Sequence, residues 1–334
     1  MLGQDDGDEY VYVTNQGNAT VSVISTTTNE VVETVDLTEL GYDAGAKPHH
    51  VAVEPGGSHW YVTLISAGRI LKFNRDNELR GAAEFEVPGL LSMDPSSDIL
   101  YVARSMAAVN PPQRIGAIDK NTMEVEEIDI FFPRPHALAV SPDGEYVFVA
   151  SLAENRIIAY EPATGESWFK DLDGPVHTLV DLEISPDGSV MVAGGQMTGA
   201  FFFFDPNQPQ TLPVSKTIEV NAAPWHPVFS PDGSRVYFAN KMANSVTVVD
   251  TETREVLKVI EGEGLSQPHG AALSSDGRYL YVSSNNLNQA RPTQTGSEFP
   301  FPGTVTVIDT NSLEIVKVLE VGPYASGVGA RPAR

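Results

Sequence analysis

The stretch Ser230-Pro-Asp-Gly-Ser-Arg-Val-Tyr-Phe238 decides the fold, because a tight turn runs directly into residues that favour β-strands. Proline after the first turn residue and glycine at the turn's end are typical of hairpins, so Asp232 is interpreted as a turn former and not as an acid. Similar turns occur at residues 141–144, 185–188 and 274–277, with weaker copies at 54–57 and 94–97. One unit is therefore repeated along the chain.

Counting the repeats gives seven. Tyr-Val runs, rich in β-branched and aromatic residues, occur at residues 10–13, 60–62, 100–102, 146–149, 190–192, 236–238 and 279–282. A repeat of 40 to 50 residues made of short strands indicates a β-propeller, in which each blade is a four-stranded antiparallel sheet. The sequence therefore predicts an all-β, seven-bladed β-propeller that occupies residues 1–334 as a single domain.

The first repeat lacks an innermost strand, and the C-terminus offers one. The segment Gly322-Pro-Tyr-Ala-Ser-Gly-Val-Gly-Ala330 aligns with the proline-led segment that opens the other repeats. We expect it to complete the N-terminal blade and to cover a sheet edge that would otherwise be exposed. The predicted blades are 9–37 with 322–330, then 48–87, 88–130, 135–172, 175–220, 224–262 and 268–321.

Composition excludes several classes of function. The chain has 21 Lys and Arg against 44 Asp and Glu, a formal charge of −23, which repels nucleic acid and anionic membrane surfaces and suits a cationic protein, a metal ion or a high-salt habitat. The absence of cysteine excludes disulfides, thiolate catalysis and Cys-ligated metals. No apolar run approaches the ~18 residues of a membrane-spanning helix.

Six of the seven histidines lie near the start of a predicted innermost strand, and only His59 lies elsewhere. Innermost strands line a propeller's channel, so these side chains are expected to converge at one rim. Neutral imidazoles without thiolates suit copper or zinc, although a single rim histidine more often bonds a neighbouring carbonyl or water. The predicted metal ligands are His49, His50, His136, His177, His226 and His269.

Further polar residues are expected on the same face. They could hold an anionic ligand or form a second shell, or each could be a solvated loop residue. This set contains Lys47, Arg104, Arg134, Asp181, Gln196, Lys241 and Tyr324. The longest insertions, at residues 38–47, 105–113 and 285–302, fall at this end too, and the last is predicted to be an ordered lid.

Two resemblances extend these inferences. Tyr12-Val-Thr-Asn15 with Ala19-Thr-Val-Ser-Val-Ile24 resembles the YVTN-type propellers of surface and secreted proteins, which implies an extracytoplasmic location and a signal peptide replaced by Met1. The histidine set is similar to that of the propeller domain of nitrous oxide reductase and of the related copper propeller of thiocyanate dehydrogenase. That resemblance implies a copper site in which His49 and His50 form a pair, with Lys241 behind the ligands. This chain departs from it by lacking a cupredoxin-like domain and one histidine.

Three functions therefore stay open at this point. The first is a propeller that binds copper, or less readily zinc, at the histidine rim. The second is a non-enzymatic surface module that binds a protein or small ligand. The third is a lactonase-like hydrolase, because propeller lactonases have a similar size and similar Pro-His and Ser-Pro-Asp-Gly repeats, and Asp181 is the best carboxylate for that chemistry. No Ser-His-Asp order, phosphate-binding loop or HExxH motif supports acyl or phosphoryl transfer.

Overall fold

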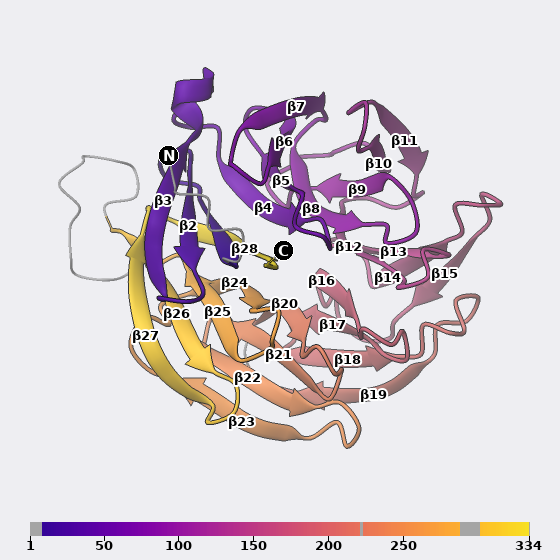
Figure 1. Ribbon diagram of the computed structural model, residues 1–334. Coiled ribbons are helices and arrows are strands. Elements are labelled where there is room, and N and C mark those ends of the chain that lie inside the picture. The colour runs from indigo at the N-terminus through magenta and orange to yellow at the C-terminus, as the bar shows by residue number, and fades with distance from the viewer. Residues whose placement is uncertain (1–8, 221–222, 288–300, 334) are drawn as a thin grey trace. The chain divides into compact units, whose positions relative to one another are not determined.

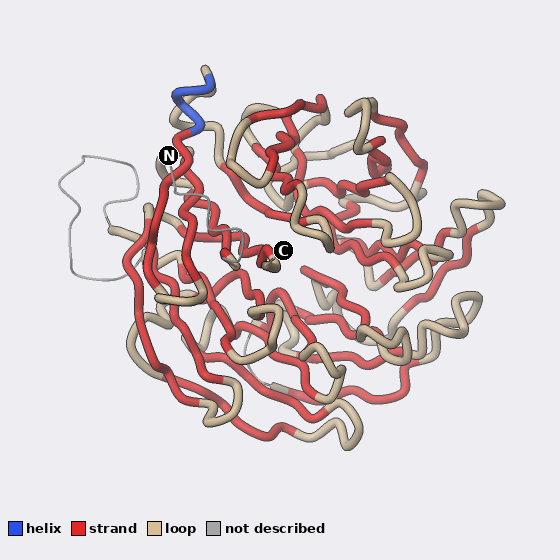
Figure 2. The backbone as a smooth tube through the Cα atoms, viewed as in Figure 1, coloured by secondary structure: helices blue, strands red, loops and turns tan. Residues whose placement is uncertain are grey.

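The computed structural model describes residues 9–220, 223–287 and 301–333. Within these ranges the strands form seven four-stranded antiparallel sheets, and the one helical element is a short 3-10 turn, Leu37–Leu40 (Figures 1 and 2). The fold is a seven-bladed β-propeller, as predicted. Most of the predicted lid at residues 285–302 lies outside the described residues. The described residues contain no helix of the length and hydrophobicity needed to span a membrane.

The chain divides into two compact units, of which the first comprises residues 1–82 and 260–334. Three sheets belong mainly to this unit. The first joins β28 (Ala325–Arg331), β1 (Tyr10–Asn15), β2 (Thr20–Ser25) and β3 (Glu30–Asp36). The second contains β4 (Pro48–Val53), β5 (His59–Leu64), β6 (Arg69–Asn74) and β7 (Leu79–Glu84). The third contains β24 (Pro268–Leu273), β25 (Tyr279–Ser284), β26 (Gly303–Asp309) and β27 (Glu314–Val321).

The second unit comprises residues 83–259 and holds most of four sheets. Blade three has β8 (Pro88–Met93), β9 (Ile99–Arg104), β10 (Arg114–Asp119) and β11 (Val125–Asp129). Blade four has β12 (Pro135–Val140), β13 (Val147–Ser151), β14 (Arg156–Tyr160) and β15 (Ser167–Asp171). Blade five has β16 (Leu179–Ile184), β17 (Met191–Gly195), β18 (Ala200–Phe204) and β19 (Val214–Glu219). Blade six has β20 (Pro224–Phe229), β21 (Arg235–Asn240), β22 (Ser245–Asp250) and β23 (Val256–Glu261).

The C-terminal strand completes the first blade, which confirms the predicted closure. β28 pairs antiparallel with β1, with Gly329 opposite Tyr12. Arg331 donates from Nη1 to the Tyr12 hydroxyl at 3.2 Å and to the Arg75 carbonyl at 2.7 Å, so the last strand is also held by side-chain hydrogen bonds. In the adjoining core the Trp60 ring stacks on Tyr12 with centroids 4.5 Å apart.

The Ser-Pro-Asp-Gly segments are hairpin turns, as predicted. At Asp232 the carboxylate accepts a hydrogen bond from the Ser230 hydroxyl at 2.6 Å and another from the Ser234 backbone N–H at 3.0 Å. Gly233 has φ +71°, a left-handed conformation that costs glycine little. These hydrogen bonds lower the pKa of Asp232 to about 2. The aspartate is a structural part of the turn.

The first strands of neighbouring blades contact one another within each unit, and each carries a bulge near its start. In the second unit β12 packs against β8 and β16, and β16 packs against β20. Register shifts interrupt the pairing of β12 between Pro135 and Ala137, of β16 between Leu179 and Leu182, and of β20 between Trp225 and Val228. A bulge re-aims the side chains beside it, so polar groups of adjacent blades can be turned toward one another here.

Candidate functional site

Four side chains of the second unit form what we call the inner-strand cluster: His136 on β12, Asp181 and Glu183 on β16, and His226 on β20. Its centre is a hydrogen bond of 2.6 Å between His226 Nδ1 and Asp181 Oδ2. The other Asp181 oxygen accepts from the Leu182 backbone N–H at 2.9 Å. A carboxylate oxygen accepts, so His226 Nδ1 is the donor in this bond.

The backbone at His226 is strained. Its φ is +39°, in the left-handed region that non-glycine residues rarely adopt. In the other six blades a left-handed residue precedes the innermost strand instead, namely Lys47, Val87, Arg134, Thr178, Gln267 and Tyr324. Left-handed residues cost roughly 1–3 kcal/mol and concentrate at functional sites. Blade six therefore places this strain on the histidine that Asp181 holds.

His136 and Glu183 are kept neutral by their surroundings. Burial lowers the pKa of His136 to about 4, although the Arg104 carbonyl, 2.7 Å from its Nδ1, opposes the shift. The charges of His226 and Asp181 also act on His136, as expected of groups on adjacent strands. Burial, with the charge of Asp181, raises the pKa of Glu183 to about 8. The Glu183 carboxyl group is therefore mostly protonated at neutral pH.

A cation and an aromatic ring border the cluster. The Lys241 ammonium lies 4.1 Å from the centre of the Trp225 ring, a cation–π contact. Trp225 in turn meets the His226 ring edge-on, with centroids 5.7 Å apart. Burial lowers the pKa of Lys241 to about 8, which still leaves the ammonium form in excess at neutral pH. Lys241, which directly follows β21, therefore lies over the ring of Trp225, the residue before His226 on β20.

The remaining predicted ligands lie in the first unit or outside a strand. In the first unit the His49 and His269 rings meet edge-on with centroids 5.6 Å apart, and Gln16 Nε2 lies 2.9 Å from His49 Nδ1. His50 follows His49 on β4, and its backbone N–H donates to the Thr63 hydroxyl at 3.0 Å. Three of the six predicted histidine ligands belong to each unit, and the six-histidine ring stays a prediction.

His177 does not occupy a strand position, contrary to our alignment of it with the other histidines. It lies two residues before β16, and both of its ring nitrogens have partners. Nδ1 is 2.8 Å from the Thr198 hydroxyl, and Nε2 is 3.0 Å from the Asp173 carbonyl. In this blade the innermost strand begins at Leu179, four residues after Pro175, whereas β4, β12, β20 and β24 begin at the proline itself. His177 therefore lies before the strand, where it lines a pocket.

The other polar residues predicted for this face have different surroundings. Arg104 is buried, not a solvated loop residue: its guanidinium donates to Glu127 at 2.6 Å and to the Glu86 carbonyl at 2.7 Å, and it stacks on Phe85. Arg134 donates to the Met106 carbonyl at 2.7 Å. Lys47 and Tyr324 lie directly before β4 and β28, and both have a left-handed backbone conformation. The Gln196 backbone N–H donates to the Thr178 carbonyl at 3.1 Å.

No three His, Asp or Glu side chains of the described residues lie close enough together to hold a metal ion. Two members of the site escaped the sequence-based prediction. Neither Trp225 nor Glu183, which lies within Leu179-Val-Asp-Leu-Glu-Ile184, was among the predicted site residues. The sequence did contain a signal for Glu183. The corresponding segments of blades four and seven, Ala137-Leu-Ala-Val140 and Gly270-Ala-Ala-Leu273, have no charged residue, whereas this strand has two carboxylates.

Comparison with known sequences gives two matches. The model of a family described as lactonase, 7-bladed beta-propeller, matches residues 176–291, a segment that contains Asp181, His226 and Lys241. An uncharacterized protein of Bacillus subtilis (strain 168), YwhL, is 25% identical over 353 residues, which cover 97% of this chain. The match covers 65% of that relative's own length.

Solved structures are similar in fold. Hydrazine synthase of Kuenenia stuttgartiensis superposes with a TM-score of 0.68 at 19% identity, over 84% of this chain and 89% of the other. A functionally unknown protein from Desulfotomaculum acetoxidans DSM 771 gives a TM-score of 0.73 at 16% identity, over 94% and 99%. At these identities the likeness concerns the fold alone. Together with the family match, it agrees with a seven-bladed propeller.

Proposed function

We propose that this protein is a hydrolase that opens lactone rings at the inner-strand cluster. The observation that carries the proposal is the buried pair of Asp181 and His226, joined at 2.6 Å on a strained backbone. A carboxylate that fixes the imidazole tautomer and stabilises its protonated form is the arrangement used for general-base catalysis. The lactonase family match over residues 176–291 supports this reaction class.

The proposed reaction needs one water molecule and no further reactant. His226 Nε2 takes a proton from the water, whose oxygen attacks the lactone carbonyl carbon. The resulting oxyanion is stabilised by positive charge, for which Lys241 beside Trp225 is the available group. The ring C–O bond then breaks, and protonated His226 returns its proton to the departing ring oxygen, so the product is a hydroxy acid.

The test is an assay of lactone hydrolysis, in which the acid released is measured in lightly buffered solution. The substrates are lactones with rings of four to seven members and a simple aryl ester. We expect turnover of at least one lactone, and a loss of that activity in Asp181→Asn and His226→Asn. The matched control is His59→Asn, because His59 also lies beside a carboxylate, Glu54, at 3.1 Å. Full activity in the two cluster variants would rule out the proposed base.

A transition-metal site is the second candidate, favoured by the contact between His49 and His269 of two different blades. Copper is expected before zinc, because the ligands would be imidazoles without thiolates. Elemental analysis of protein purified after growth with both metals tests it, compared with a variant in which all six predicted histidines are alanine. An extracytoplasmic location and a protein partner remain expectations that accompany this candidate.

A further inference from the structure

A pocket of about 560 Å³ lies in the second unit, outside the inner-strand cluster. It is bounded on one side by residues 172–175, which follow β15, and on the other by β18 and β19 of blade five. The pairing of these strands explains its wall: Ala200 lies opposite Glu219, and Phe202 lies opposite Thr217. Directly opposed residues of an antiparallel pair project from the same face, so these four side chains line one surface.

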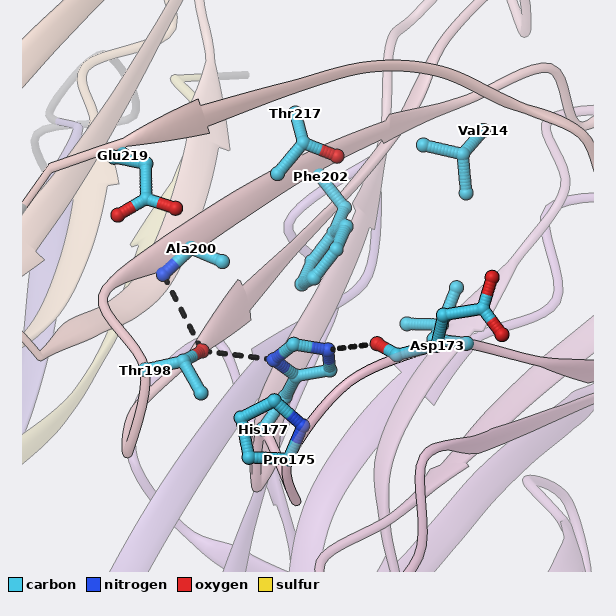
Figure 3. A pocket seen from close by; sticks show the side chains of 10 residues that line it. Asp173, Pro175, His177, Thr198, Ala200, Phe202, Val214, Thr217 and Glu219 are labelled. Atoms are coloured by element: carbon cyan, nitrogen blue, oxygen red, sulfur yellow. Dashed lines mark hydrogen bonds between the residues drawn. The ribbon is translucent and has the colours of Figure 1, made fainter.

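The floor of the pocket is a fixed imidazole (Figure 3). His177 Nε2 lies 3.0 Å from the Asp173 carbonyl, which can only accept, so Nε2 carries the proton. Nδ1 then accepts from the Thr198 hydroxyl, 2.8 Å away. The Phe202 ring meets the imidazole edge-on at a centroid distance of 4.8 Å. Both ring nitrogens of His177 are thus held by hydrogen bonds within the protein.

The lining of the pocket combines apolar surface with negative charge. Phe202, Leu172 and Val214 supply the apolar part, and Asp173 and Glu219 are the lining residues that carry charge. In Figure 3 the Asp173 and Glu219 side chains lie on opposite sides of the Phe202 and His177 rings. No Lys or Arg lines the pocket, and the chain as a whole carries −23. An anion would be repelled, whereas a cation gains from both the carboxylates and the aromatic face.

We propose that this pocket binds a small organic cation, an ammonium or guanidinium group attached to an apolar body. The apolar body packs against Phe202 and Val214, and the charged group lies toward Asp173 or Glu219. A volume of about 560 Å³ fits a ligand of this kind. The site is independent of the proposed hydrolase activity, since it shares no residue with the inner-strand cluster.

The experiment uses three probes of similar shape and different charge: phenethylammonium, phenethyl alcohol and phenylacetate. Ligand-observed NMR on the full chain should show binding of the ammonium only, weakened by added salt because the charges are exposed. The double variant Asp173→Asn, Glu219→Gln removes whichever carboxylate the ammonium approaches and should weaken binding about two- to fivefold, as expected for one exposed ion pair. Phe202→Leu should weaken it further by removing the aromatic face.

The control is Glu166→Gln, which makes the same change of charge at an exposed residue that does not line the pocket. Its affinity should match that of the unmodified chain, and a thermal unfolding curve for each variant verifies that the fold is retained. Equal binding of all three probes, equal affinity in the double variant and the control, or no binding of the ammonium at millimolar concentration would each overturn the proposal.

Discussion

Two histidine–carboxylate pairs in this chain look alike in composition but differ in hydrogen-bond distance, in the exposure of the histidine and in backbone conformation. Glu54 and His59 are 3.1 Å apart at a hairpin turn, whereas Asp181 and His226 are 2.6 Å apart on two innermost strands. Exposure of the histidine side chain is 31% in the first pair and 9% in the second. Backbone strain is confined to the second, at His226. We therefore interpret the short, buried pair of Asp181 and His226, with its strained backbone, as functional. The pair of Glu54 and His59, in which the carboxylate accepts several hydrogen bonds at a turn, is interpreted as structural.

The hydrogen bonds of the two carboxylates show the same contrast. Burial alone would raise the pKa of Glu54, but hydrogen bonds from Ser58, Tyr61 and His59 outweigh it and lower the pKa. Glu54 thus stabilises the turn that corresponds to the Ser-Pro-Asp-Gly turns of other blades. Asp181 accepts from His226 with one oxygen and from the Leu182 backbone N–H with the other.

The largest expected effect separates the two histidines. His226→Asn keeps a donor to Asp181 but has no basic nitrogen, so kcat for lactone opening should fall about 100- to 10,000-fold. His59→Asn should leave kcat within about twofold of the unmodified chain. Initial rates at saturating lactone measure both variants. A loss of similar size in His59→Asn would mean that both variants act through the fold.

The next effect is a pH dependence of stability due to His136. The folded pKa is about 4 and the unfolded value is about 6.5, so the unfolded chain takes up a proton first as the pH falls. This group therefore destabilises the fold progressively from about pH 6.5 down to about pH 4, by about 3 kcal/mol in total.

His136→Asn keeps a donor to the Arg104 carbonyl and removes the titration. Urea unfolding at pH 7 and pH 4.5 should show a smaller difference in this variant than in the unmodified chain. An unchanged difference in His136→Asn would show that other groups cause the pH dependence.

A smaller effect concerns Glu54. Glu54→Ala removes the acceptor of the Tyr61 hydroxyl, bonded at 2.8 Å, and of His59, and should lower the free energy of unfolding by about 1–2 kcal/mol. Lactone opening should be unaffected at a temperature where the variant is folded. Denaturant unfolding and initial rates on the same sample separate the two. Lost activity with unchanged stability would show that Glu54 has a functional role and would contradict its interpretation as structural.

The smallest effect is at the Ser-Pro-Asp-Gly turns. Hydrogen bonds lower the pKa of Asp232 to about 2, below its usual value of 3.8, so the turn gains stability above about pH 4 and loses it as the pH falls through about 2. Asp232→Asn should leave activity intact and flatten the stability profile in that acid range. Thermal unfolding between pH 2 and pH 5 follows this effect.

The repeats made the fold predictable, because each Ser-Pro-Asp-Gly turn and Tyr-Val run specifies its own hairpin locally. Closure by β28 was predictable for a related reason: the first repeat lacked one strand, and residues 322–330 matched it. The site was predictable only in part. Asp181 and His226 were both candidates, but their pairing across 45 positions depends on bulges in β16 and β20 that no single repeat reveals.

Errors had equally local causes. The innermost strand of blade five begins at Leu179, after the left-handed Thr178, and not at its proline, so His177 lies before the strand. His226, with the same Pro-Xaa-His spacing, lies on β20. Arg104 is the last residue of β9 and is buried there, because the Glu86 carbonyl and Glu127 accept hydrogen bonds from its guanidinium. The contact of Lys241 with Trp225 depends on the pairing of β20 with β21, which the sequence of a single repeat does not reveal.

The central claim is that Asp181 and His226 act as one catalytic unit, and a double-mutant cycle tests it most directly. Lactone-opening rates are measured for Asp181→Asn, His226→Asn and the double variant. If Asp181 works through His226, the double variant should be as slow as His226→Asn alone, because the orienting group has nothing left to orient. Losses that multiply in the double variant would show two independent roles and contradict the account.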